Sequence, residues 1–156
     1  MSESEKGLRP ILLIVDDDKE IAGCKRKFDA TGVLNPVVSI TSAGEAFEFL
    51  TRRGRHAGAT HRNPGVILMS LSLPDAHGSE FLEFLKEKHM KIPVVVLTDS
   101  ESTQSPAMLR SIGADGIMEK PISVDGFLRA VNPLEPDWLE MRRLGRAPSG
   151  IDVDDC

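Results

Sequence analysis

Five polar or charged side chains in this sequence follow short apolar runs and could together do chemistry. In chain order they are Asp16, Asp17, Ser70, Thr98 and Lys120. Paired carboxylates are hard oxygen ligands that suit a hydrated divalent cation such as Mg²⁺. An ammonium group and a hydroxyl opposite them suit an oxyanion such as phosphate. If the fold brings these five side chains together, they predict a site for a phosphoryl group and its metal ion.

The elements that must position these residues are five apolar runs separated by segments with helical spacing. The runs cover residues 11–15, 37–40, 66–69, 94–97 and 116–118. The first helical segment carries Ile21, Cys24 and Phe28. Strands that alternate with helices predict right-handed crossovers and an α/β fold, with a doubly wound parallel sheet covered on both faces. The working edge of such a sheet is the one at which the strands end.

Helix ends and loops add detail to this expectation. We expect Asp18 to cap the first helix, because a carboxylate is favoured at a helix N-terminus. The spacing of Ser42 and Glu45 predicts a capping box at the second helix. Residues 52–64 are polar and basic, so we expect a solvated loop there.

Composition bounds the class of protein and its partners. A net charge of −5, from 24 acidic and 19 basic residues, argues against nucleic acid as the main partner. Two cysteines, Cys24 and Cys156, predict no disulfide framework, and a reducing cytoplasmic location fits them. The longest apolar run is far shorter than the roughly 20 residues that span a bilayer, so we expect no membrane contact.

A length of 156 residues predicts one folded domain. We expect an N-terminal tail over residues 1–9, the domain over residues 10–133, and a C-terminal extension over residues 134–156. The extension is rich in Pro, Arg and Asp, and we expect it to be partly disordered. Its Trp138 is expected to pack back on the domain, with a dimer interface as the alternative.

The order of these residues resembles the receiver domain of two-component response regulators, over roughly Ile11 to Val131. The matching pieces are Asp16-Asp17, Pro74, Gly78, Thr98 and Lys120-Pro121. The resemblance implies a CheY-like, flavodoxin-like (βα)5 fold with strand order 2-1-3-4-5. It also implies Mg²⁺ ligands at Asp16, Asp17 and the backbone carbonyl of Ser72, and phosphoryl contacts from Thr98 and Lys120. The segment after the second helix resembles stand-alone receivers that partner phytochrome-type histidine kinases.

The sequence departs from this family at its centre. Where the family has the aspartate that accepts phosphate, this chain has Ser70. A serine hydroxyl is a weak nucleophile unless a neighbouring base takes its proton. Loss of a third carboxylate should weaken Mg²⁺ binding and relieve repulsion among the acids. Ile117 stands where the family usually has a switch aromatic, and we expect Lys120 to pair with Asp16 or Asp17.

These features predict a degenerate receiver, a single-domain response regulator that is not an enzyme and acts by protein contact. The expected partner is a histidine kinase or another signalling protein. A homodimer is a further expectation, through the face that holds the helix near residues 106–112, the strand at 116–118 and the last helix.

Two alternatives stay open from the sequence alone. The chain could still accept phosphate at another residue, such as Asp75 or Ser72. It could instead be a Mg²⁺-dependent phosphohydrolase with Asp16 or Asp17 as its nucleophile. Phosphorylation followed by site mapping tests the first alternative, and an assay of an aryl phosphate with Mg²⁺ tests the second.

Overall fold

The computed structural model describes residues 8–60, 62–75, 77–99 and 105–141. Residues 1–7 of the predicted tail 1–9, and residues 142–156 of the predicted extension, lie outside the described residues. The elements are β1 (Ile11–Ile14), α2 (Asp18–Ala30), β2 (Val37–Ile40), α3 (Ala43–Thr51), the 3-10 helix η1 (Gly54–His56), β3 (Val66–Ser70), α4 (Gly78–Glu87), β4 (Val94–Thr98), α5 (Pro106–Ser111), β5 (Gly116–Glu119), α6 (Val124–Val131) and the 3-10 helix η2 (Asn132–Leu134). Within the described residues, no helix combines the length and apolar character that crossing a membrane requires.

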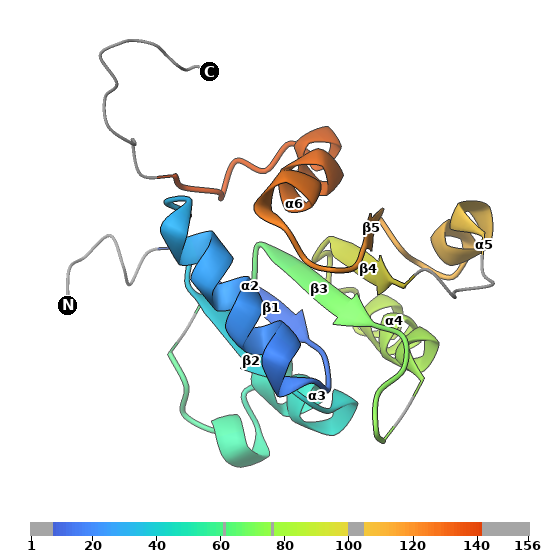
Figure 1. The fold of residues 1–156 in the computed structure, drawn as a ribbon. Helices are drawn as coiled ribbons and strands as arrows, with labels where there is room; N and C mark the ends of the chain where they lie inside the picture. The colour runs from blue at the N-terminus through green and yellow to red at the C-terminus, as the bar shows by residue number, and fades with distance from the viewer. Residues whose placement is uncertain (1–7, 61, 76, 100–104, 142–156) are drawn as a thin grey trace, which may run out of the picture.

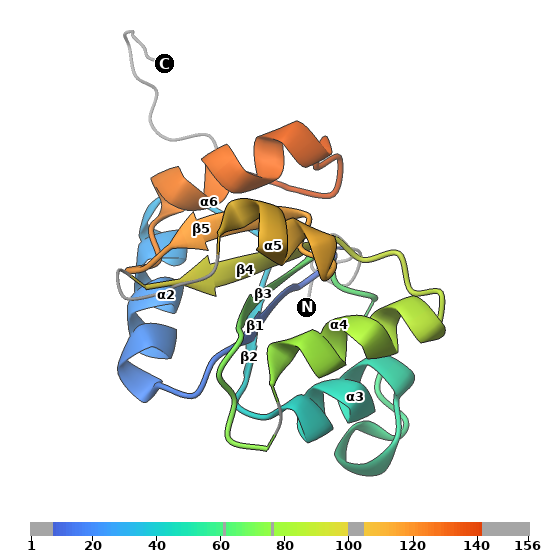
Figure 2. The same cartoon turned by 90° about the vertical axis from the view of Figure 1, so that its right-hand side faces the viewer.

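The five strands form one parallel sheet in the order β2-β1-β3-β4-β5, which confirms the predicted fold class (Figure 1). In the middle of the sheet, Ile14 of β1 lies in register with Ile40 of β2 and Met69 of β3. Helices α2 and α6 cover one face, and α3, α4 and α5 cover the other (Figure 2). The order of the strands reverses between β1 and β3, and ligands of such sheets bind outside the strand ends beside this point.

Alternate side chains of each strand enter two separate cores, because successive residues of a strand point to opposite faces. In β1, Leu12 and Ile14 join the core beneath α3, α4 and α5, whereas Ile11 and Leu13 join the core beneath α2 and α6. All four are fully buried. Each such burial contributes roughly 1.5–3 kcal/mol relative to exposure. The strands are therefore firmly held, and the residues that follow them start from fixed positions.

The cap of the first helix differs from the prediction. Asp17, not Asp18, is the N-cap residue of α2, and its Oδ1 accepts the N–H groups of Lys19 at 2.9 Å and Glu20 at 3.2 Å. An N-cap residue needs an extended backbone. Asp17 has one, with φ −154°, whereas Asp18 is already the first residue of the helix.

The second helix, α3, is tied to the basic segment that follows it. The Oγ of Ser42 accepts the N–H of Glu45 at 3.2 Å, so half of the predicted capping box forms. The Glu45 carboxylate contacts His56 Nε2 at 3.0 Å, and Arg55 Nε lies 2.7 Å from Glu48 Oε1. None of residues 52–60 is buried, in line with the predicted solvated segment. The sequence did not predict that two glutamates of α3 pair with these basic groups and hold η1 against the helix.

The segment after α6 packs at the edge where the strands begin. Trp138 contacts Gly65 and joins the core beneath α2 and α6, which confirms that it packs on its own domain. The buried side chain of Asn35 donates from Nδ2 to the carbonyls of Arg9 at 2.8 Å and Trp138 at 3.0 Å. Its Oδ1 accepts the N–H of Glu140 at 2.7 Å. The predicted extension is thus packed through residue 141.

Candidate functional site

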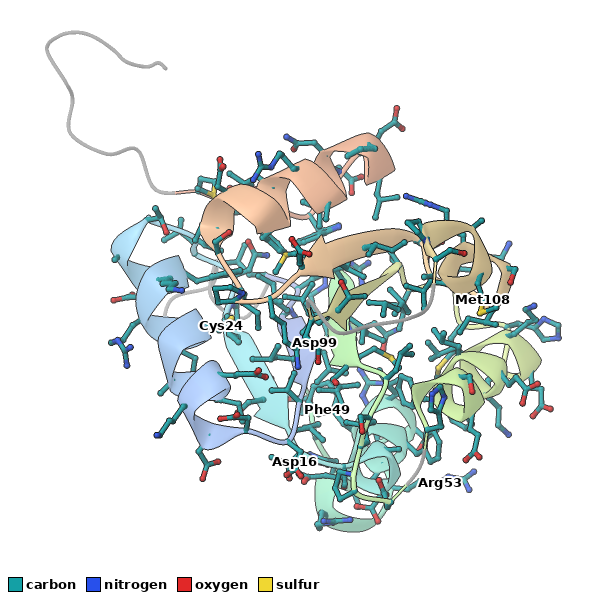
Figure 3. All side chains as sticks on the ribbon, turned by 45° about the vertical axis from the view of Figure 1, so that its right-hand side comes forward. Asp16, Cys24, Phe49, Arg53, Asp99 and Met108 are labelled. Atoms are coloured by element: carbon teal, nitrogen blue, oxygen red, sulfur yellow. The ribbon has the colours of Figure 1, made fainter. Side chains whose placement is uncertain are left out.

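The parallel sheet places the candidate residues along one edge. Ser70 and Thr98 are the last residues of β3 and β4, while Asp16 and Lys120 follow β1 and β5. Because neighbouring strands are parallel and in register, these positions lie at the carboxyl edge of the sheet. Figure 3 labels two residues of this edge, Asp16, which follows β1, and Asp99, which follows β4. The four positions therefore lie where sheets of this type bind ligands.

The two residues of the acidic pair, Asp16 and Asp17, make different contacts. Asp17 accepts the first-turn N–H groups of α2, whereas the side chain of Asp16 is exposed. A carboxylate engaged by a helix end has fewer lone pairs left for a cation. In the part of the chain that the structure describes, no group of three or more His, Cys, Asp or Glu side chains could hold a metal ion. Mg²⁺ sites in proteins use as few as one or two carboxylates, with water among the remaining ligands. The weak Mg²⁺ binding expected from the sequence stays a prediction.

The lysine at this edge has a different partner from the one predicted. Lys120 Nζ lies 3.3 Å from Glu20 Oε2, so it pairs with α2 rather than with Asp16 or Asp17. Asp17 is turned to the helix backbone, and Glu20, in the first turn of α2, supplies the carboxylate that reaches the loop after β5. Both side chains of this ion pair are partly buried. Nothing in the sequence distinguished Glu20, in the first turn of the helix, as the partner of Lys120.

A lysine of α2 makes a second contact with the loop after β5. Lys27 Nζ donates to the carbonyl of Ile122 at 2.9 Å. Glu20 and Lys27 are seven residues apart, which places them on one face of the helix, two turns from each other. The peptide bond between Lys120 and Pro121 is cis. The loop after β5 is therefore attached to α2 at two points.

The hydroxyl of Ser70 is partly buried and weakly bonded. Its Oγ accepts the N–H of Ser72 at 3.4 Å. Among the described residues, no histidine or carboxylate is hydrogen-bonded to this hydroxyl. The nearest histidine in sequence, His77, is the N-cap of α4, and its Nδ1 contacts Ser79 Oγ at 2.8 Å and accepts the Ser79 N–H at 3.1 Å. Nothing in this arrangement activates Ser70 as a nucleophile.

Asp75, in the loop after β3, anchors the start of α3. Its Oδ1 accepts the N–H of Ala43 at 2.9 Å, and its Oδ2 accepts the N–H of Gly44 at 2.8 Å. The hydrogen bonds from Ala43 and then Gly44 lower the pKa of Asp75. Sequence reasoning missed this contact, because it joins residues about thirty positions apart. The first N–H groups of any helix lack partners within that helix, so the predicted start of α3 was a signal that some hydrogen-bond acceptor lies near it.

Thr98 and Ile117 lie at the positions expected of switch residues, at the end of β4 and inside β5. The carbonyl of Thr98 accepts the N–H of Lys120 at 2.7 Å, and its side chain is partly buried. Ile117 packs against the core beneath α3, α4 and α5. An aliphatic side chain at this position has no hydroxyl to exchange between inward and outward contacts.

This fold and this edge are those of a signalling receiver. The family described as "Response regulator receiver domain" matches residues 12–132. The match covers most of the chain and, apart from Ile11, all five strands. The chain belongs to the response regulator receiver domain family of two-component systems.

Relatives of known name agree with this assignment. The chain is 29% identical over 135 residues to the probable methanogenesis regulatory protein FilR2 of Methanothrix harundinacea, covering 85% of each. It is 25% identical to the response regulator SaeR of Staphylococcus aureus, covering 79% of this chain and 49% of SaeR. It is also similar to the solved bacteriophytochrome response regulator AtBRR, with a TM-score of 0.77 and 29% identity over 87% of this chain and 99% of that one.

Proposed function

We propose that this chain is a degenerate receiver that signals through protein contact and not through a phosphoryl group at residue 70. The observation that carries the proposal is Ser70 at the end of β3, whose hydroxyl is hydrogen-bonded, among the described residues, to the N–H of Ser72 and to no histidine or carboxylate. A serine in this setting lacks the base that would make it a nucleophile. It would also form an ester, which lacks the ready hydrolysis of an acyl phosphate.

The engagement of neighbouring carboxylates supports the same proposal. Asp75 uses both oxygens to hold α3, so it is poorly placed to accept phosphate in place of Ser70. Asp17 caps α2, which disfavours it as the nucleophile of a phosphohydrolase. Lys120 is held by Glu20, so its charge is neutralised without a phosphoryl group. The proposed protein therefore catalyses no phosphate turnover and binds Mg²⁺ weakly.

The expected partners are a histidine kinase, another signalling protein, or a second copy of this chain. In the labels of Figure 1, the proposed homodimer face comprises α5, β5 and α6. Two features support it. β5 is an edge strand of the sheet, and Met108 of α5 is 51% exposed. An unpaired strand edge beside an exposed apolar side chain favours association. Sedimentation of the Met108→Glu variant against the parent chain tests this face.

Phosphorylation is the direct test. The full chain and its Ser70→Asp variant are incubated with phosphoramidate and MgCl₂, and intact mass reports incorporation. We expect no stable addition to the parent chain, and one added group on Ser70→Asp. The double variant Ser70→Asp/Asp75→Asn should still be modified, which would assign the group to residue 70. Stable incorporation into the parent chain, mapped to Ser72 or Asp75, would overturn the proposal.

A further inference from the structure

A groove of ≈ 460 Å³ lies between the end of α4 and the start of β4, at the edge of the sheet opposite Ser70. Pockets of this size accommodate small ligands or a few peptide side chains. The apolar part of its lining comprises Leu82, Leu85, Met90, Ile92 and Pro93. A second groove, of ≈ 520 Å³, shares residues 89–93 with it and continues to Trp138 in the C-terminal segment. One surface channel therefore leads from the C-terminal segment to the end of α4.

The rim of the α4–β4 groove is positively charged. Lys86, His89 and Lys91 line it and are exposed. Across the described ranges, neither lysine forms an ion pair. The carboxylate of Asp115 in the lining is already engaged, because it accepts the N–H of Val94 at 2.9 Å. The groove thus combines an apolar floor with unpaired cationic side chains, and an acidic, partly apolar peptide complements both.

The chain itself contains such a peptide outside the described residues. Residues 151–155 read Ile-Asp-Val-Asp-Asp. In an extended backbone, alternate side chains point to opposite sides. Ile151 and Val153 would then face one way, and Asp152 and Asp154 the other. We propose that residues 151–155 dock in the α4–β4 groove of the same chain, with the two apolar side chains on the floor and the aspartates beside Lys86 and Lys91.

The connecting chain is long enough for this. Met141, the last described residue, pairs with Val33 in an isolated antiparallel bridge, which fixes the start of the tail near Trp138. The ten residues from there to Ile151 span up to roughly 33 Å when extended. A domain of this length has a radius of gyration of about 15 Å. The tail can therefore follow the second groove to the end of α4.

The rival occupants are a second copy of the tail, in trans, and an acidic partner protein. Docking in cis is favoured because a tethered segment is present at high effective concentration, about millimolar for short flexible linkers. While bound, the tail would cover Lys86 and Lys91 and withhold them from other acidic peptides. This inference does not depend on the phosphorylation state of residue 70, so it stands or falls separately from the proposed function.

A nitroxide label on Cys156 tests the proposal in the full chain. Burial raises the pKa of the Cys24 thiol to about 11, so modification near neutral pH is directed to Cys156. We expect strong paramagnetic broadening of the amide signals of Lys86, His89 and Lys91. That broadening should be lost in the variant Asp152→Asn/Asp154→Asn/Asp155→Asn and in Lys86→Gln/Lys91→Gln.

Matched controls separate docking from chance contact. The variant Lys19→Gln/Lys25→Gln removes two exposed lysines of α2, on a different face, and should leave the broadening unchanged. One control is a mixture of two samples: nitroxide-labelled chain without isotope enrichment, and isotope-enriched chain without nitroxide. This mixture should show no broadening. Broadening in that mixture would assign the groove to another copy. Uniform broadening across the domain, or broadening that persists in the triple asparagine variant, would overturn the proposal.

Discussion

The two edges of the sheet are built differently. At the edge where strands begin, Asn35 is 3% exposed and makes three hydrogen bonds to backbone groups. At the edge where strands end, Asp16 is exposed, and Ser70 has one long contact at 3.4 Å. The first edge is closed by a buried, fully satisfied polar group, and the second carries polar groups that water reaches.

This difference separates stability from signalling. Breaking a buried hydrogen bond leaves its partner unsatisfied and costs about 1–3 kcal/mol. Breaking an exposed contact costs far less, because water replaces the lost partner. We therefore expect substitutions at the amino edge to destabilise the fold, and substitutions at the carboxyl edge to leave it folded while changing contacts. The following variants test that contrast.

The largest effect is expected for Asn35→Ala. The substitution removes the side chain that joins Arg9, Trp138 and Glu140, and leaves their backbone groups without partners. We expect the free energy of unfolding in urea to fall by about 3 kcal/mol. Asn63→Ala is the matched control at an exposed asparagine, and it should change stability by less than about 0.5 kcal/mol. Similar losses in both variants would refute the contrast between the edges.

A smaller loss is expected for Gly65→Ala. A Cβ at residue 65 would overlap the indole ring of Trp138, so the ring must move. We expect a loss of about 1–3 kcal/mol from overpacking, with a shifted emission spectrum from the single tryptophan of the chain. Gly23→Ala in α2 is the control, because a Cβ there would make only an ordinary van der Waals contact, with Arg26 Nη2 at 3.9 Å. Alanine should stabilise that helix by up to about 1 kcal/mol. Unchanged emission in Gly65→Ala would show that the contact is dispensable.

The fold was predictable because its signals are local and repeated. Runs such as residues 11–15 and 94–97 predicted buried strands, and the structure buries them completely or nearly so. The strand order followed from the resemblance carried by Asp16-Asp17, Thr98 and Lys120-Pro121. These runs were predictable as buried strands because exposing their apolar side chains to water is unfavourable.

The partners at the carboxyl edge were less predictable. The sequence suggested Asp16 or Asp17 for Lys120, and the structure pairs it with Glu20. Several carboxylates lie within reach of the Lys120 ammonium group. The interaction energies of the possible ion pairs differ too little for residue spacing in the sequence to predict which pair forms. The Asp75 contact was missed for another reason, since it depends on a loop that returns to α3 from a distant part of the chain.

Asp75→Asn is expected to have an intermediate effect. The amide keeps one acceptor and loses the other, so one N–H of the α3 first turn loses its partner, at a cost of about 1 kcal/mol at pH 7. The pKa of Asp75 is lowered in the folded state by the N–H groups of Ala43 and Gly44. Its contribution is therefore present above the unfolded pKa, near 3.8, and is lost as the pH falls through the folded value.

Urea titrations at pH 7 and pH 3 check this expectation. The parent chain should lose more stability between the two values than Asp75→Asn does. Asp125→Asn is the control, because it breaks an exposed ion pair with Arg129 in α6. That pair should contribute about 0.3–0.5 kcal/mol. An identical acid response in the parent and Asp75→Asn would show that the Asp75 carboxylate does not hold α3.

The smallest effect is expected for the ion pair of Lys120 and Glu20, measured by a double-mutant cycle with Lys120→Met and Glu20→Gln. Both side chains are partly exposed, at 21% and 29%, so solvent screens their attraction. We expect a coupling energy of about 0.5–1 kcal/mol, larger than for the more exposed pair of Arg129 and Asp125 because less water intervenes. Both single variants should remain folded. A coupling above about 2 kcal/mol would contradict the comparison, since the carboxyl edge would then hold the fold as firmly as Asn35 does.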